Sequence, residues 1–162
     1  MAIVGPAPDY ARLGGVPLEA RFDRPTAAAL APLRDMVVAA GTEGGLPWAQ
    51  VVDPFLPGPR APRRVLVAAP DSAITVLGVA GSSKFGVAGL CWGASGARDI
   101  RDFIDFRLVG EDGVPRGRAV RIVEDFFRGG IVNCSVGTDE LGFLVAWWDG
   151  DALWVRRVHL PR

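Results

Sequence analysis

The chain has 162 residues, of which 49% are hydrophobic and 22% are charged, and its 18 basic and 18 acidic residues leave no net charge. This composition is typical of a folded domain and excludes wholesale disorder. A chain without net charge has no overall field that would attract nucleic acid or an anionic membrane, so both are disfavoured as partners. We expect a single domain over residues 1–162, with no cofactor and no structural metal.

The apolar and basic patterning bears on the location of the protein. The first 15 residues lack the basic and apolar regions of a signal peptide, and no apolar stretch reaches the roughly 18 residues that span a bilayer. We therefore expect a cytoplasmic protein in which Cys91 and Cys134 stay reduced. Lys84 is the only lysine, so arginine supplies 17 of the 18 basic residues, a bias typical of a high-GC bacterial or phage genome.

The first 64 residues predict an arm, a helix and a long connection. Residues 1–24 have few periodic apolar positions and read as an N-terminal arm. In residues 25–41, apolar side chains recur at three- and four-residue spacing from Leu30 to Ala40, which predicts a helix that Pro32 kinks or starts. Residues 41–64 contain five prolines, which resist regular pairing, and predict a Pro-rich connection that wraps the core.

Three strands are expected next, over residues 63–69, 72–80 and 85–92, because these runs are rich in Val, Leu and Ile. The glycine-spaced stretch GVAGSSKFG lies between the last two. It places Gly78 and Lys84 as in a phosphate loop of the form GxxxxGK[ST], but Ser83 and Phe85 occupy the other two fixed positions. A phosphate loop also runs into a helix, whereas residues 85–92 read as a strand. We therefore predict a four-residue hairpin turn from Gly81 to Lys84.

Two helices are predicted in the middle of the chain, over residues 97–108 and 116–130. In the first, Ile100, Phe103, Ile104 and Leu108 form one apolar face. In the second, the stripe runs from Ala119 to Phe127 and two glycines end it.

The last third predicts three more strands, over residues 131–137, 141–148 and 151–160. Asp149-Gly150 between the last two is a strong signal for a two-residue hairpin loop. Such a loop would place Trp148 opposite Asp151, Val145 opposite Trp154 and Glu140 opposite His159. The whole pattern predicts an α+β fold in the order α-βββ-αα-βββ, with an antiparallel sheet of about six strands.

Two constellations could carry chemistry. Cys91 precedes a glycine-rich turn into a predicted helix, a position that lowers a thiol pKa, and His159 is the only histidine that could serve as its base. This gives one alternative function, a small cysteine-dependent hydrolase or transferase. The carboxylate pairs Asp102/Asp105, Glu111/Asp112, Glu124/Asp125 and Asp139/Glu140 have arginines near them and read as solvated ion pairs.

A second alternative is a nucleic-acid-associated protein that uses its arginines. Arg116, Arg118, Arg121 and Arg128 lie on or beside one predicted helix, and Arg156 and Arg157 lie on the last predicted strand. Glu124 and Asp125 interrupt the helix set.

The leading hypothesis rests on the C-terminal tryptophans. Trp147 and Trp148 are adjacent in a predicted strand, so they point to opposite faces and one can be exposed. Large exposed aromatic residues near arginine are typical of protein interfaces. We therefore expect a non-enzymatic protein-interaction or assembly protein that binds a protein partner or itself through a sheet face, as chaperone-like, immunity-like or phage and secretion assembly subunits do. Its binding residues are expected to be Trp147, Trp148, Trp154, Arg156 and Arg157.

Overall fold

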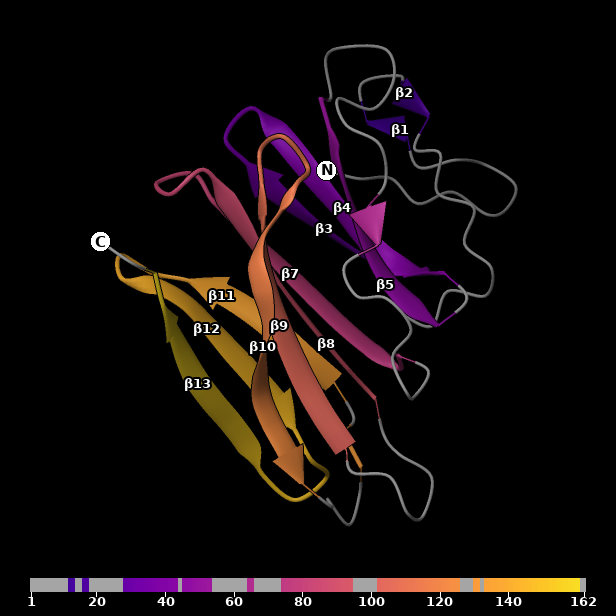
Figure 1. Ribbon diagram of the computed structural model, residues 1–162, viewed down its shortest axis with the longest axis vertical. Helices are drawn as coiled ribbons and strands as arrows, with labels where there is room; N and C mark the ends of the chain where they lie inside the picture. Colours follow the sequence, from indigo (N-terminus) through magenta and orange to yellow (C-terminus); the bar gives the residue numbers. More distant parts are fainter. Residues whose placement is uncertain are drawn as a thin grey trace.

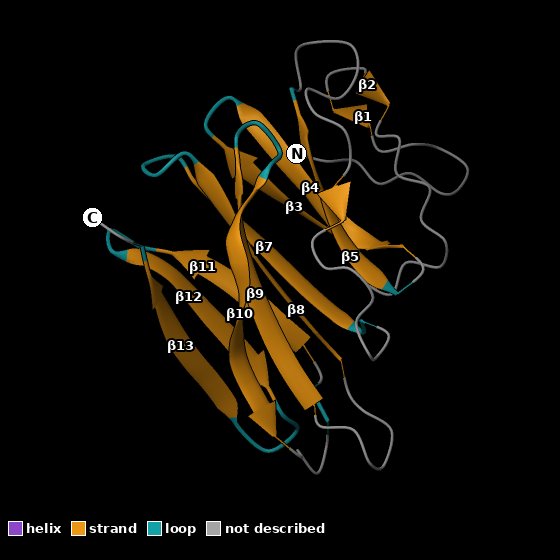
Figure 2. Ribbon diagram, viewed as in Figure 1, coloured by secondary structure: helices purple, strands orange, loops and turns teal. Residues whose placement is uncertain are grey.

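The structure is a computed structural model, and it describes residues 12–13, 16–17, 28–43, 45–53, 64–65, 74–94, 102–125, 130–131 and 133–160. Every regular element in these ranges is a β-strand, and none of them contains a helix (Figure 2). The predicted α+β fold is therefore wrong, and the described part of the chain is all-β.

The strands form three antiparallel sheets and one short pair, and neighbours in each sheet are consecutive in the chain. The short pair consists of β1 (Arg12–Leu13) and β2 (Val16–Pro17), and the N-terminal sheet consists of β3 (Ala28–Leu33), β4 (Met36–Glu43), β5 (Leu46–Val52) and β6 (Arg64–Val65). The central sheet consists of β7 (Val76–Ser82), β8 (Val87–Ala94), β9 (Asp102–Gly110) and β10 (Pro115–Asp125). The C-terminal sheet consists of β11 (Asn133–Thr138), β12 (Gly142–Trp148) and β13 (Leu153–His159).

The three sheets stack as layers with the central sheet in the middle. Figure 1 shows the N-terminal strands on one side of it and the C-terminal sheet on the other. Alternate residues of β8 enter different cores: Leu90 and Trp92 pack with β4 and β5, whereas Cys91 packs with β11 and β12. Because a strand points its side chains alternately to two faces, β8 is buried on both.

The layers approach each other most closely along β7. A Cβ atom on Gly81 would lie 1.7 Å from the carbonyl oxygen of Pro32 in β3, and one on Gly78 would lie 2.8 Å from the carbonyl oxygen of Cys134 in β11. These two glycines point to opposite faces of the strand. They let the backbones of both outer sheets touch the edge of the central sheet, which no larger residue would allow.

The predicted helix over 25–41 is instead the hairpin of β3 and β4. Leu33 pairs with Met36 around a turn at Arg34 and Asp35. Arg34 adopts φ 55°, a left-handed conformation that glycine usually takes, and its backbone N–H donates to Ser83 Oγ (3.2 Å). A tertiary contact thus stabilises this turn, which contains no glycine or proline from which the sequence could predict it.

The two predicted central helices are also wrong, because residues 102–110 and 115–125 form β9 and β10. β9 alternates apolar and polar residues from Ile104 to Leu108, but Phe103 and Val109 are apolar and buried in the other phase, so the apolar residues together also match a helical spacing. β10 has register shifts between Arg116 and Val120 and between Arg121 and Val123, which break its alternation. Residues 97–101 of the first predicted helix and residues 126–129 of the second lie outside the described residues.

The Pro-rich connection over 41–64 contains a strand, β5, which pairs with β4 and β6. Pro47 lies within it. Trp48 is buried opposite Gly41, where a Cβ atom would lie 2.7 Å from the indole ring. The prolines of residues 54–63, and the arm over 1–24 apart from β1 and β2, lie outside the described residues.

The strands predicted over 72–80, 85–92, 131–137, 141–148 and 151–160 are confirmed, with small shifts of their ends. The central hairpin turn has four residues, as predicted, but runs from Ser83 to Gly86 because Ser82 pairs with Val87. Of the strand predicted over 63–69, only Arg64–Val65 is described, as β6.

The last hairpin has a different register from the predicted one. Trp148 pairs with Leu153, Trp147 with Trp154, and Gly142 with His159, so four residues form the loop. The cause is Asp149, whose Oδ1 accepts the backbone N–H groups of Asp151 (3.0 Å) and Ala152 (2.8 Å). An aspartate that hydrogen-bonds its own turn in this way stabilises a wider loop than the Asp-Gly pair predicts.

Three turns use an aspartate of this kind, and they make the fold sensitive to acid. Hydrogen bonds from the backbone N–H groups of Val114, Leu141 and Ala152 are the main cause that lowers the pKa of Asp112, Asp139 and Asp149, respectively. A carboxyl group whose pKa is lower in the folded than in the unfolded chain stabilises the fold above the unfolded value. That contribution disappears as the pH falls through the folded value.

We therefore expect the urea midpoint to fall as the pH is lowered below about 4. The triple variant Asp112→Asn, Asp139→Asn and Asp149→Asn keeps the acceptor oxygens and should show a smaller fall. Asp151→Asn removes one carboxylate from the same loop as Asp149 and is the matched control; its urea midpoint should fall as much as that of the wild type. Equal pH profiles for the wild type and the triple variant would contradict this prediction.

Candidate functional site

The C-terminal sheet turns one face to the core and one to solvent. Trp147 is directly opposite Cys134 and Trp154 on the inner face and is buried. Trp148 points to the outer face and is 44% exposed. The two adjacent tryptophans thus lie on opposite faces, as the strand assignment predicts.

Three exposed apolar residues gather on the outer face, and we call Trp148, Leu153 and Val155 the outer patch. Leu153 is the direct cross-strand neighbour of Trp148, and Val155 follows two residues along β13 on the same face. Leu153 is 64% and Val155 60% exposed. Since monomeric soluble proteins keep contiguous apolar surface small, this cluster is a candidate binding surface.

Trp154 lies at the border of the inner face and is held from two sides. Its ring stacks on Trp147, with centroids 6.4 Å apart and planes at 15°, and its Nε1–H donates to Asp149 Oδ2 (2.6 Å). The indole is half exposed but fixed. A fixed aromatic side chain loses little conformational entropy when a partner covers it.

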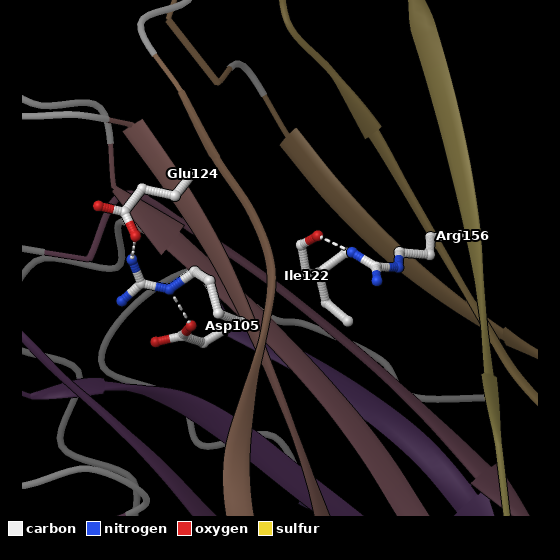
Figure 3. Close-up of polar contacts among 5 residues, drawn as sticks. Asp105, Ile122, Glu124 and Arg156 are labelled. Carbon is white, nitrogen blue, oxygen red and sulfur yellow. Dashed lines mark hydrogen bonds and ion pairs between the residues drawn. The ribbon is translucent and has the colours of Figure 1, made fainter.

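Arg156 and Arg157 point to opposite faces of β13. Arg156 crosses the gap between layers and donates from Nη1 to the carbonyl oxygen of Ile122 in β10 (Figure 3). Arg157 forms an ion pair with Asp139 in the turn between β11 and β12. Both guanidinium groups therefore have intramolecular partners, and both residues remain exposed.

In the described ranges the C-terminal sheet ends at β13, and no strand pairs with its outer edge. Among the described residues β13 pairs with β12 alone, and Figure 1 shows it along the outer margin of the sheet. Asp149 N–H donates to Ala152 O (3.3 Å), and hydrogen-bonded pairs alternate along an antiparallel ladder. Residues 154, 156 and 158 therefore bond to β12, whereas the amide and carbonyl groups of 153, 155 and 157 point outward.

Cys91 and His159 are not brought together. Cys91 is fully buried between the central and C-terminal sheets and forms a disulfide with Cys134, with Cα atoms 6.5 Å apart. His159 is exposed at the end of β13, opposite Gly142. The expectation of two reduced cysteines is not met in the structure, and the geometry gives no support to a thiolate nucleophile at Cys91.

The central arginines lie on strand β10 and are largely paired with acids. Arg116 contacts Asp112 (2.6 Å), and Arg121 contacts both Asp105 (2.5 Å) and Glu124 (2.7 Å, Figure 3). Arg118 is exposed, and Arg128 lies outside the described residues. These pairs neutralise the charge locally, so the geometry does not support a basic stripe for nucleic acid.

The carboxylate pairs and the glycine-spaced turn offer no site either. In the described part of the chain, no group of three or more His, Cys, Asp or Glu side chains could hold a metal ion. Lys84 lies at the exposed tip of the turn, where its Nζ donates to the backbone oxygen of Glu140 (3.0 Å). The lysine thus links two neighbouring turns, as an ordinary hairpin residue does.

Leu153 and Val155 are not among the binding residues expected from the sequence. The sequence does contain a signal for exposed apolar residues in this strand. Its apolar residues occupy both alternating phases, namely Leu153, Trp154, Val155 and Val158. A strand in an outer layer of stacked sheets buries at most one of its two faces.

In the part of the chain that the structure describes, the fold is all-β, with three stacked sheets and an exposed apolar sheet face beside an unpaired strand edge. Comparisons with protein-family models, with curated proteins and with solved structures find no match to this chain. No helix in the described ranges has the length and apolar character needed to cross a membrane.

Proposed function

We propose that this chain is a non-enzymatic protein-interaction or assembly protein that binds a protein partner, or itself, through the outer face of the C-terminal sheet. The observation that carries the proposal is the outer patch, in which Trp148, Leu153 and Val155 lie side by side and largely exposed. Covering such a surface removes apolar area from water, which stabilises the bound state by about 25 cal/mol for each Å² buried.

The composition around the patch also supports binding of a protein. Interfaces are enriched in tryptophan and arginine, and their energetically dominant residues cluster in the centre of the contact. Trp148 at the end of β12 and Trp154 near the start of β13 flank the same hairpin loop, and Arg157 lies further along β13. Arg157 borders the patch on the outer face, where its pairing with Asp139 holds the guanidinium in place.

Site-specific photo-cross-linking tests the proposal. A benzophenone amino acid at position 148 should yield one discrete cross-linked protein product in cells that make the protein. The same group at position 120 is the matched control, because Val120 is also an exposed apolar strand residue, at 52%, but lies on β10. Position 120 should give no such product, and Leu153→Asp should suppress the product at 148. Identical patterns at 148 and 120 would overturn the proposal.

The proposed location remains the cytoplasm, but the disulfide makes it open to a direct test. Cytosolic proteins rarely keep disulfides, whereas the structure pairs Cys91 with Cys134. Acid quenching of the cells, alkylation of the denatured protein and mass spectrometry measure the oxidation state, because unfolding exposes the buried cysteines. Modified cysteines would support the cytoplasm, and protected ones an oxidising compartment.

A further inference from the structure

In the described part of the chain, the outer edge of β13 is the strongest candidate for a further binding site, because its backbone groups have no strand partner. The backbone groups of Leu153, Val155 and Arg157 point away from β12, and all three residues are exposed. A row of outward N–H and C=O groups is a template on which another strand can pair. The identity of that strand is the question.

We propose that the occupant is a second copy of this chain, whose β13 pairs antiparallel with the first across a two-fold axis at Val155. This inference deepens the proposed function and rests on it, since it names the partner of the C-terminal sheet. Two three-stranded sheets would join into one of six strands. A two-fold interface of this kind closes on itself and uses the same surface in both copies.

The charges and the length of β13 select this register from the five that outward groups at 153, 155 and 157 allow, with the axis at any residue from 153 to 157. An axis at Arg157 would oppose two copies of Arg157, and an axis at Leu153 would pair that strand residue alone. Centring the axis on Arg156 would place Arg156 opposite Arg156 of the second copy, and directly opposed like charges destabilise a sheet. Centring it on Trp154 avoids the repulsion but pairs only three strand residues, 153–155. Centring it on Val155 pairs five residues, 153–157, and opposes no like charges.

The Val155 register is also complementary side chain by side chain. On the inner face, Trp154 lies opposite Arg156 of the second copy, which suits a cation–π contact with an indole already fixed by Asp149. On the outer face, Leu153 lies opposite Arg157 of the second copy and can pack on its aliphatic stem. Arg156 and Arg157 thus favour one register and still permit another strand to pair with the edge.

Cysteine trapping tests the register. In Val155→Cys the two new thiols face each other across the axis at a Cα separation of about 5.5 Å, within the range of a disulfide. In Leu153→Cys the equivalent residues are four positions apart, roughly 14 Å, which is too far. Val120→Cys is the control for disulfides that form by random collision between molecules. The native cysteines are paired and buried.

Under mild oxidation, Val155→Cys should form covalent dimer about tenfold faster than either control, because pairing raises the effective concentration of the thiols. Equal rates for all three variants would overturn the proposed pairing.

Sedimentation velocity from micromolar to millimolar concentration provides the second measurement. Val155→Pro removes one outward N–H from each copy and no bond to β12, so it should weaken self-association by about 10- to 100-fold with the fold intact. Val120→Ser changes an exposed residue of β10, leaves the edge of β13 unchanged and should self-associate like the wild type. A wild type that stays monomeric throughout would overturn this inference. The photo-cross-link from position 148 to a different protein would still be expected in that case, so the two failures can be told apart.

Discussion

Reduction of the Cys91–Cys134 disulfide should lower the free energy of unfolding by about 4 kcal/mol, because the bond closes a chain segment of 43 residues. An open segment of that length has more conformational freedom in the unfolded chain, so the folded state becomes relatively less stable. A loss of this size is a large share of the 5–15 kcal/mol that stabilises a typical domain.

The position of the bond strengthens the expectation. It joins β8 of the central sheet to β11 of the C-terminal sheet inside the second core, close to Gly78. Urea denaturation with and without reductant measures the change. The double variant Cys91→Ala and Cys134→Ala is the control, and reductant should have no effect on it. Identical midpoints for oxidised and reduced wild type would show that the bond does not constrain the chain.

Gly81→Ala should destabilise the fold by about 3 kcal/mol or more, as overpacking of a rigid contact does. The added methyl group would lie 1.7 Å from the carbonyl oxygen of Pro32 and 2.8 Å from its carbonyl carbon, both of which are backbone atoms. No side-chain rotation can relieve that overlap. β3 would have to move away from β7, and the hydrogen bond from Arg34 N to Ser83 would be strained with it.

Gly137→Ala is the matched control for this substitution. Gly137 also lies in a strand, but nothing is within 4 Å of its added Cβ. Because glycine weakens strands, alanine there should be neutral or stabilise the fold by up to about 1 kcal/mol. Thermal and urea unfolding of both variants give the comparison. Equal stabilities for Gly81→Ala and Gly137→Ala would contradict the close approach of the layers.

The predictable part of the fold is the part with local signals. The strands around the central turn and in the last third have runs of β-branched and aromatic residues bounded by glycine and aspartate, and the structure confirms them. The missed strands lack such signals. The turn at Arg34 contains no glycine, β9 is buried on both faces, and β10 carries two irregularities of register. Each of these depends on contacts between sheets, which spacing along one chain does not encode.

The candidate site was predictable in outline but not in composition. Trp148 follows from alternation alone, because one of two adjacent tryptophans in a half-buried strand must face outward. Leu153 and Val155 depend on β13 being the last strand of its sheet. The register that aligns Leu153 with Trp148 depends on the Asp149 turn, and the pairing of Cys91 with Cys134 depends on the stacking of two sheets.

The most direct test of the association surface is residue-resolved amide hydrogen exchange in β13 at low and high protein concentration. The amides of Trp154, Arg156 and Val158, bonded to β12, should be protected at both concentrations. Those of Leu153, Val155 and Arg157 should exchange rapidly in dilute solution and become protected as the concentration rises. Fast exchange of these three amides at every concentration would contradict pairing at this edge.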